Sequence, residues 1–305
     1  MISFRNSVID FLKEKGFHCE DEIPGTSYNE AFGLIKASSE DNKVSRNIVL
    51  ISTQAESADE AETASMQVRK VLQEMQPLPL IISEDRWNRQ REISQSRILA
   101  HLEIFFPIYA RNCEVRKIDK NTAADFLSKT HSYGHATCRY CYGLFLKRHT
   151  GHIAAMLGND FPLQQADQAE TGSLVAVASF SNARKWTKGD KFIRSYEWTR
   201  YASLPHLRVI GGMGRLLKAF IKDVQPDDIM SYADLEWSEG KVYEQLGFTF
   251  EGYKDPVCFR IDTENWSRNA LRGQESVKSS SEQNQLRFFQ NFGSAKYRLK
   301  LTEYE

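Results

Sequence analysis

Several features that would place the chain in a special class are missing from its sequence. Its 305 residues include only five cysteines, an odd number, so we expect no disulfide framework and a reducing cytoplasm. No apolar run approaches the roughly 20 residues that span a bilayer. The N-terminal segment "MISFRNSVIDFLKEKG" carries charges throughout and lacks the apolar core of a signal peptide. We therefore expect a cytoplasmic protein that does not enter a membrane.

The chain also has no excess of charge of either sign. It contains 40 basic and 40 acidic side chains, so binding to a polyanion has to come from a local patch. Hydrophobic residues make up 41% of the chain, which leaves room for two modest domains. The sequence does not set an oligomeric state.

The first part of the chain has an alternating α/β pattern. Helical spacing predicts a helix over residues 2–15, and β-branched runs predict strands at 47–52 and 78–83. Helices are predicted between these strands and after them. We therefore expect a smaller α/β domain at residues 1–110.

In outline this domain resembles a PD-(D/E)xK nuclease. Such enzymes hold a divalent metal with an acidic residue followed by an E-x-K triplet. Around "NIVLISTQAESADE" there is no E-x-K, only Ser52, Gln54 and Glu56. The resemblance therefore implies a degenerate module kept for binding or folding, and an unrelated α/β domain is the alternative.

From residue 111 onward the predicted strands become more frequent. They include 138–146, 173–180 and 194–203, and later strands alternate with short helices. We expect residues 111–265 to form a mixed twisted sheet flanked by helices, which is an α/β (α+β) fold. Residues 147–172 read as a surface loop or flap. Residues 266–305 read as a linker and a last strand that packs on this second domain.

Three glycines stand where a helix has to begin, in "RVIGGMGRLLKAFIKD". The start of a helix exposes backbone N–H groups and carries partial positive charge. Glycines there let a phosphate approach these N–H groups closely. The alternative is that the glycines only permit a tight turn from strand to helix.

The order strand, glycine turn, helix, strand and then "VYEQLGF" resembles the GNAT superfamily of acyltransferases. This resemblance implies that acetyl-CoA or another acyl-CoA is the cofactor. The usual loop has Arg or Gln three residues before the first glycine of a G-x-G/A unit. Here Val209 stands at that place, and the arginine comes one residue early, at Arg208. The cofactor-binding residues that the resemblance implies are Trp198, Val209, Ile210, Gly211, Gly212, Met213, Gly214 and Arg215.

Further motifs extend this likeness along the chain. "IYARNCEVRKID", "DFLSKTHSYG", "SYADLEWSEGKVYEQLGF" and "NFGSAKYRLKL" are similar to a group of phage and mobile-element proteins. In that group a GNAT-like domain follows a nuclease-like one. The E-x-x-R and "SYAD" pieces are remotely similar to the Mom family of phage DNA-modification proteins. The resemblance implies an N-acyltransferase whose acceptor is DNA or another nucleic acid. The alternative is a non-catalytic nucleic-acid-binding protein that retains the fold.

Two residues are the candidates for proton transfer. Glu197 and Arg200 lie three apart on one predicted strand, so they face opposite sides unless a β-bulge intervenes. The resemblance implies such a bulge, a backbone oxyanion donor near Trp198 and Glu197 as general base. The alternative is a buried Glu197–Arg200 ion pair. Tyr243 is the implied general acid toward a thiolate, or else an ordinary half-buried aromatic residue.

Other side chains are candidates for contact with the acceptor. His131 matches the histidine of the phage group, while Asp234 and Trp237 end the strand 229–234, where Asp234 could instead cap the next helix. The basic stretch around Trp186 could neutralise phosphates while the indole stacks on a base, or it is a solvated loop. The substrate-side candidates are His131, Arg200, Asp234, Trp237 and Trp186. The basic stretch contains Arg184, Lys185, Lys188 and Lys191.

The segment "HSYGHATCRYC" invites a zinc interpretation. It brings His131, His135, Cys138 and Cys141 within eleven residues. On a strand, however, the two cysteines would face opposite sides. We therefore favour two small buried cysteines and predict no metal site.

Overall fold

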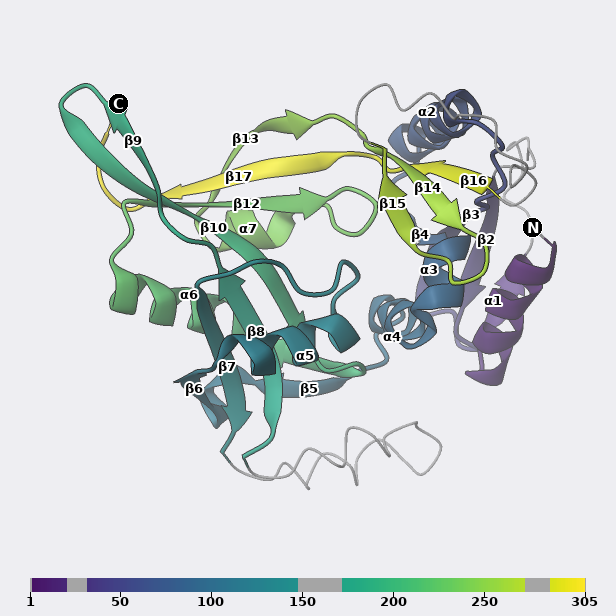
Figure 1. Ribbon diagram of the computed structural model, residues 1–305. Coiled ribbons are helices and arrows are strands. Elements are labelled where there is room, and N and C mark those ends of the chain that lie inside the picture. The colour runs from purple at the N-terminus through teal and green to yellow at the C-terminus, as the bar shows by residue number, and fades with distance from the viewer. Residues whose placement is uncertain (1, 21–31, 148–171, 272–285, 305) are drawn as a thin grey trace. The chain divides into compact units, whose positions relative to one another are not determined.

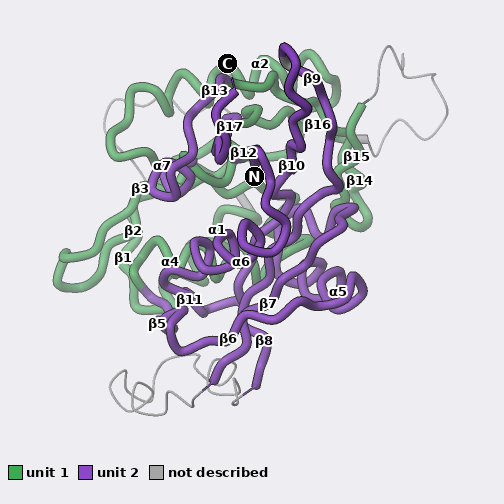
Figure 2. The backbone as a smooth tube through the Cα atoms, turned by 90° about the vertical axis from the view of Figure 1, so that its left-hand side faces the viewer, with its two compact units in different colours: residues 1–103, 234–239, 253–294 green, residues 104–233, 240–252, 295–305 purple. Residues whose placement is uncertain are grey.

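The computed structural model describes residues 2–20, 32–147, 172–271 and 286–304 (Figure 1). The chain divides into two compact units (Figure 2). Unit 1 contains residues 1–103, 234–239 and 253–294, and unit 2 contains 104–233, 240–252 and 295–305. Most of the predicted loop 147–172 and of the predicted linker lies outside the described residues. In the part of the chain that the structure describes, no helix is long and apolar enough to cross a membrane.

Unit 1 is built on a four-stranded sheet in the order β1-β2-β3-β4. The first three strands are antiparallel, and β4 is parallel to β3, with helix α2 as the crossover. This α/β arrangement agrees with the sequence pattern, although strand β2 was not predicted. The elements are α1 (Ile2–Glu14), β1 (His18–Glu20), β2 (Phe32–Ser38), β3 (Ser45–Ile51), α2 (Ala58–Glu74) and β4 (Leu80–Ser83).

The single helix predicted after β4 is broken into two. Helix α3 (Glu84–Arg89) and helix α4 (Arg91–His101) are separated by Gln90, whose φ of −130° and ψ of 51° are not helical. The break places Trp87, which is fully buried, against the aromatic rings of α1. Its ring lies 5.8 Å from that of Phe11.

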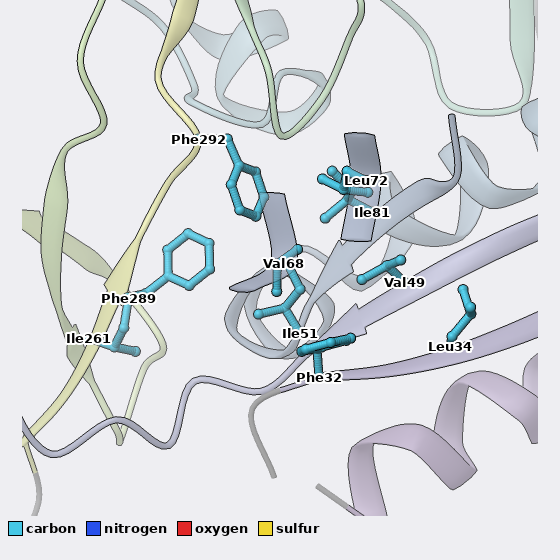
Figure 3. Packing of buried hydrophobic residues seen from close by; sticks show 10 residues of the cluster. All are labelled: Phe32, Leu34, Val49, Ile51, Val68, Leu72, Ile81, Ile261, Phe289 and Phe292. Atoms are coloured by element: carbon cyan, nitrogen blue, oxygen red, sulfur yellow. The ribbon is translucent and has the colours of Figure 1, made fainter. Parts of the chain in front are cut away.

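A second, three-stranded sheet completes unit 1, in the order β15-β14-β16. Ile261 and Phe289 of this sheet, with Phe292 just after it, pack with Val68 and Ile51 in one hydrophobic core (Figure 3). This packing is why residues 253–294 group with unit 1, whereas the sequence placed the domain boundary after residue 265. The strands are β14 (Cys258–Asp262), β15 (Arg268–Ala270) and β16 (Leu286–Gln290).

Unit 2 contains the predicted twisted mixed sheet, in the order β13-β17-β12-β10-β8-β7-β6, with β9 added beside β10. Strands β6, β7, β8 and β10 are antiparallel neighbours, whereas β10 and β12 are parallel. The last strand, β17, lies between β12 and β13. The strands are β6 (Cys113–Lys117), β7 (Tyr140–Leu146), β8 (Leu174–Phe180), β9 (Arg184–Lys188), β10 (Lys191–Ser203), β12 (Asp228–Asp234), β13 (Thr249–Lys254) and β17 (Ser294–Lys300).

Helices cover both faces of this sheet, as strand alternation requires. Cys141 of β7 packs in a cluster with Leu127 of α5 (Lys120–Thr130). The next residue, Tyr142, points to the other face, where its ring lies 6.2 Å from Phe220 of α6 (Gly212–Val224). The sheet of unit 2 is therefore buried between α5 and α6.

A short parallel pair explains where unit 2 begins. Strand β5 (Phe106–Tyr109) pairs with β11 (Leu207–Ile210), which leads directly into α6. The turn η1 (Ala110–Asn112) then joins β5 to β6. Residues 104–110 therefore group with unit 2, seven residues before the predicted boundary.

Candidate active site

The two parallel strands at the centre of the unit 2 sheet part after three residue pairs. Strand β10 pairs with β12 from Ser195 to Glu197, opposite residues 228–230. From Trp198 onward β10 keeps only β8 as its partner. Beyond this point the Ser231 hydroxyl of β12 lies 2.9 Å from the carbonyl oxygen of Trp198. The backbone of each strand thus becomes available to other groups at one place in the sheet.

The predicted bulge occurs at this same place. Trp198 lies opposite Phe180 and Arg200 opposite Ser179, so Thr199 is the extra residue of β10. A bulge leaves its extra residue out of the hydrogen-bond ladder and shifts the alternation of side chains. The Thr199 side chain bonds to Ser179, with their hydroxyl oxygens 2.8 Å apart. The bulge therefore makes the backbone of β10 irregular between Trp198 and Arg200.

Arg200 is held by backbone carbonyls. Its Nε donates to the carbonyl of Gly134 at 3.1 Å, and a terminal nitrogen donates to the carbonyl of Thr199 at 2.7 Å. Burial lowers the pKa of Arg200, and the negative charge of Glu197 opposes that shift. Among the described residues no direct Glu197–Arg200 ion pair is formed, so the carboxylate of Glu197 is not committed to Arg200.

The Tyr243 hydroxyl reaches the point where the strands part. Tyr243 lies on the short helix α7 (Lys241–Gln245), and its oxygen is 2.9 Å from the Ser231 hydroxyl. Its ring lies edge-on to Trp198 at 6.2 Å and stacks on Tyr297 at 5.2 Å. Burial raises the pKa of Tyr243, so the phenol keeps its proton at neutral pH. Both the acid role and the aromatic packing role are compatible with this position.

The glycine turn begins α6 and has structural requirements of its own. Gly211 is the N-cap, with a φ of 76° that favours glycine. A Cβ on Gly212 would lie 2.6 Å from the Tyr201 hydroxyl oxygen, and one on Gly214 would lie 3.2 Å from Leu246. The glycines therefore do permit the tight turn, as the structural alternative proposed.

The same turn also exposes donors. The first backbone N–H of α6 that bonds back is that of Arg215, which donates to the carbonyl of Gly211 at 3.0 Å. The N–H groups of residues 212–214 precede it and have no intrahelical acceptor. In the described part of the chain the buried Nε of Arg215 also has no hydrogen-bond partner. The half-buried Arg215 and these three backbone donors thus belong to the first turns of the same helix.

Arg208 does not take the place that the family loop would give it. Strand β11 alternates, so Val209 is buried while Arg208 and Ile210 are exposed. The Arg208 guanidinium lies 5.0 Å from the ring of Phe105. The cation beside the first turn of α6 is therefore Arg215, on the helix itself. Met213 is half-buried between the two glycines.

His131 lies close in the chain to a contact of Arg200. It is the C-cap of α5, and its Nδ1 accepts the backbone N–H of Tyr133 at 3.1 Å. The loop that it closes ends at Gly134, whose carbonyl accepts from Arg200. The structure thus links the His131 loop to the bulged strand.

The zinc interpretation finds no support in the described residues, which gather no group of three His, Cys, Asp or Glu side chains able to hold a metal. His135 bonds to Ser128 at 3.1 Å. The sulfur atoms of Cys138 and Cys141 lie 3.3 Å apart, so the two cysteines do not face opposite sides as alternation predicted. Strand β7 begins only at Tyr140, so alternation does not apply to Cys138.

Asp234 and Trp237 group with unit 1. Asp234 forms an ion pair with Arg86 at 3.2 Å and accepts the N–H of Glu236. Trp237 lies under two guanidinium groups, that of Arg97 at 4.2 Å and that of Arg86 at 5.0 Å. Asp234 does not cap α7, whose N-cap is Gly240. Both side chains thus have partners within unit 1, and their contact with an acceptor stays a prediction.

Trp186 also has a partner within the chain. Its ring meets that of Tyr304 edge-on at 5.4 Å.

The sequence did not single out Ser231 or Tyr201, whose hydroxyl groups lie beside Tyr243 and Gly212, respectively. Serine and tyrosine on a predicted strand carry no pattern that separates them from ordinary residues, so only their tertiary contacts reveal them.

Comparisons with known proteins give fold-level likenesses only. No protein-family model and no curated protein matches the chain. An acetyltransferase of Bacillus subtilis in complex with CoA is 12% identical with a TM-score of 0.34, covering 62% of this chain and 99% of that chain. A spermidine N-acetyltransferase chimera from Vibrio cholerae and hSSAT is 10% identical, with a TM-score of 0.33 over 62% and 96%. A GNAT-family acetyltransferase from Bacillus anthracis is 13% identical, with a TM-score of 0.29 over 62% and 95%. These values are low, so we take the function from the residues of this chain.

Proposed function

We propose that unit 2 is an acyl-CoA-dependent N-acyltransferase of the GNAT type. The observation that carries this proposal is the position of the Tyr243 hydroxyl. It is bound to Ser231 where the parallel strands β10 and β12 part, next to the bulge at Thr199. A proton donor, irregular backbone and parted strands are what acyl transfer from a thioester needs at one place.

The first turn of α6 is where an acyl-CoA would be held. Three backbone N–H groups and the unpartnered Nε of Arg215 suit the negative charge of a pyrophosphate. The glycines at 212 and 214 leave room that a side chain would fill. The proposed cofactor site consists of residues 209–215 together with Trp198, which lies where β10 and β12 part. A bound acyl-CoA supplies an activated thioester.

Side chains and backbone groups of the chain supply the proton transfers, the oxyanion stabilisation and the contacts with the acceptor. The carboxylate of Glu197 can accept a proton from the acceptor amine. Backbone N–H groups at the bulge can stabilise negative charge on a carbonyl oxygen. Tyr243 holds a proton on its hydroxyl oxygen and can give it to a departing thiolate. Arg200 and the His131 loop linked to it are the proposed contacts for the acceptor.

For the acceptor we propose an amine on DNA or on another nucleic acid of a phage or mobile element. The basic hairpin that precedes Glu197 on the same strand supports this choice. That hairpin equally favours a second candidate function, a nucleic-acid-binding protein that retains the fold without catalysis. For unit 1 we propose a degenerate nuclease-like module with a binding or folding role.

A coupled assay separates the two candidates. The full chain is incubated with acetyl-CoA and either single-stranded DNA, duplex DNA or a lysine peptide, and free thiol and acceptor mass are measured. Acceptor-dependent thiol release with a 42-Da gain, which is the mass of an added acetyl group, is the expected result. Nucleic-acid binding without thiol release for any acceptor supports the non-catalytic candidate. Acetylation of the peptide alone would remove nucleic acid as the acceptor.

A further inference from the structure

The hairpin formed by β9 and β10 has two unlike faces. Trp186 pairs with Ile193, and Thr187 pairs with Phe192, so these two pairs point to opposite faces. Ile193 is buried, whereas Phe192 is 79% exposed. Strand alternation therefore turns Phe192 outward and Trp186 to the other side.

The C-terminal segment lies beside the β9–β10 hairpin (Figure 1), and it meets the hairpin on the face of Trp186. Tyr304 packs against the Trp186 ring and hydrogen-bonds to the buried carboxylate of Asp228. Lys191 donates to the carbonyl of Glu303 at 3.0 Å. Trp186 thus packs against the C-terminal segment of unit 2, and its stacking on a base stays a prediction.

The other face combines an exposed ring with positive charge. Residues 184–194 contain five basic side chains and one acidic one, in a chain with no net charge. Arg194 is paired with Asp227 at 3.5 Å. Lys185, which lies opposite Arg194 on the same face as Phe192, is exposed and forms no ion pair among the described residues. The outward face therefore presents an unpaired cation near an exposed phenylalanine.

We propose that this outward face, defined by Lys185, Thr187 and Phe192, binds an unpaired strand of nucleic acid. Phe192 stacks on a base, and Lys185 with its basic neighbours neutralises phosphates. A single strand satisfies both needs because it offers free base faces and a negative backbone, whereas bases in a duplex are already stacked. This inference rests on the proposed function, since it names the polymer that carries the acceptor.

The hairpin is continuous with the candidate active site. Phe192 and Trp198 are six residues apart on β10, which corresponds to about 20 Å along a strand. A strand bound at Phe192 is therefore anchored within a few nucleotides of the bulge. In this proposal the hairpin binds the nucleic-acid strand, and the residues at the bulge transfer the acyl group to it.

Fluorescence anisotropy with labelled 20-nucleotide DNA, RNA and duplex DNA tests the proposal. We expect the single strands to bind more tightly than the duplex, and Phe192→Ala to weaken that binding about tenfold. Lys185→Glu should weaken it at 50 mM salt and lower its salt dependence. Tyr253→Ala removes a ring that is 74% exposed elsewhere and serves as the control, expected to bind like the wild type.

Three results would overturn the proposal. In the first, Phe192→Ala and the wild type bind single strands equally well. In the second, the wild type prefers duplex DNA. In the third, the wild type sediments as a dimer that the Phe192→Ala substitution dissociates. Acetyl-CoA titration of the same samples distinguishes this failure from failure of the acyltransferase assignment. Any of these three results, found while the wild type still binds acetyl-CoA, rejects only the hairpin surface, whereas failure of the wild type to bind acetyl-CoA rejects the acyltransferase assignment.

Discussion

The hydroxyl oxygens of Tyr243 and Ser231 lie 2.9 Å apart, and the same serine oxygen lies 2.9 Å from the carbonyl of Trp198. The serine hydroxyl carries one proton, and both the phenol oxygen of Tyr243 and the carbonyl oxygen of Trp198 lie within reach of it as acceptors. The phenol is thereby tied to the backbone of the bulged strand. This chain of two hydrogen bonds positions the proposed acid.

Replacing Tyr243 by Phe tests the acid role. The ring packing against Trp198 and Tyr297 is kept, so the melting temperature should change little. Loss of the proton donor should lower kcat about 100-fold and leave acetyl-CoA affinity nearly unchanged. Steady-state kinetics and calorimetry measure both quantities. Tyr297→Phe removes the neighbouring phenol and is the matched control, expected to keep kcat within about twofold. Equal kcat in Tyr243→Phe and wild type would reject the acid role.

Ser231→Ala tests whether the serine positions the tyrosine. It leaves the carbonyl of Trp198 without its buried partner, which costs about 1 kcal/mol of stability. We expect kcat to fall about tenfold, less than in Tyr243→Phe, and the alkaline limb of the pH–rate profile to shift. Ser231→Thr retains a hydroxyl and should recover part of the rate. A variant that loses stability but keeps the wild-type kcat and pH profile would show that the serine is only structural.

Arg215→Met tests the half-buried arginine near the start of α6. Since Arg215 Nε has no partner in the described part of the chain, its removal should not destabilise the fold. We expect acetyl-CoA to bind about tenfold more weakly, measured by calorimetry. Lys218→Met removes an exposed cation of the same helix and should leave affinity unchanged. Equal losses in the two variants would indicate a general charge effect and not a site.

Glu236 should make unit 1 sensitive to acid. Burial by itself would raise its pKa, but the charges of Arg268 and Arg86 lower it to about 2. In the unfolded chain a glutamate has a pKa of about 4.3. The stabilisation is therefore present above about pH 4.3 and is lost as the pH falls toward 2.

Glu236→Gln should cost about 3 kcal/mol at pH 7, because it leaves Arg268 and Arg86 short of a buried counter-charge. Thermal unfolding from pH 7 to pH 3 should then show a shallower loss of Tm than the wild type. Burial raises the pKa of the neighbouring Asp234, which acts in the opposite direction in both proteins. Glu62→Gln, at an exposed position of α2, is the control and should follow the wild-type curve.

Local sequence patterns predicted much of unit 2. The run from β10 through the glycine turn to α6 and β12 depends on periodicity and on glycine, which act over a few residues. The bulge between Glu197 and Arg200 was expected and is present at Thr199. Placement of Tyr243 beside β12 also agrees with the predicted order of elements.

The contacts that the sequence did not predict are made with residues distant in the chain. Trp186 stands among lysines in the sequence, and only the pairing of β9 with β10 shows that its ring meets that of Tyr304. Asp234 ends a strand as predicted, yet Arg86, 148 residues away, determines its contacts. Gln90 interrupts a segment whose composition is helical throughout. Each outcome follows from tertiary contacts that no local pattern encodes.

The most direct test of the proposed function is calorimetric titration of the full chain with acetyl-CoA, for the wild type and for Met213→Glu. The substitution needs no unusual φ and places a carboxylate among the N–H groups of residues 212–214. We predict saturable binding by the wild type and at least a tenfold loss of affinity in Met213→Glu, with unchanged circular dichroism. Absence of binding by the wild type, or binding that Met213→Glu does not weaken, would contradict the proposed acyl-CoA site.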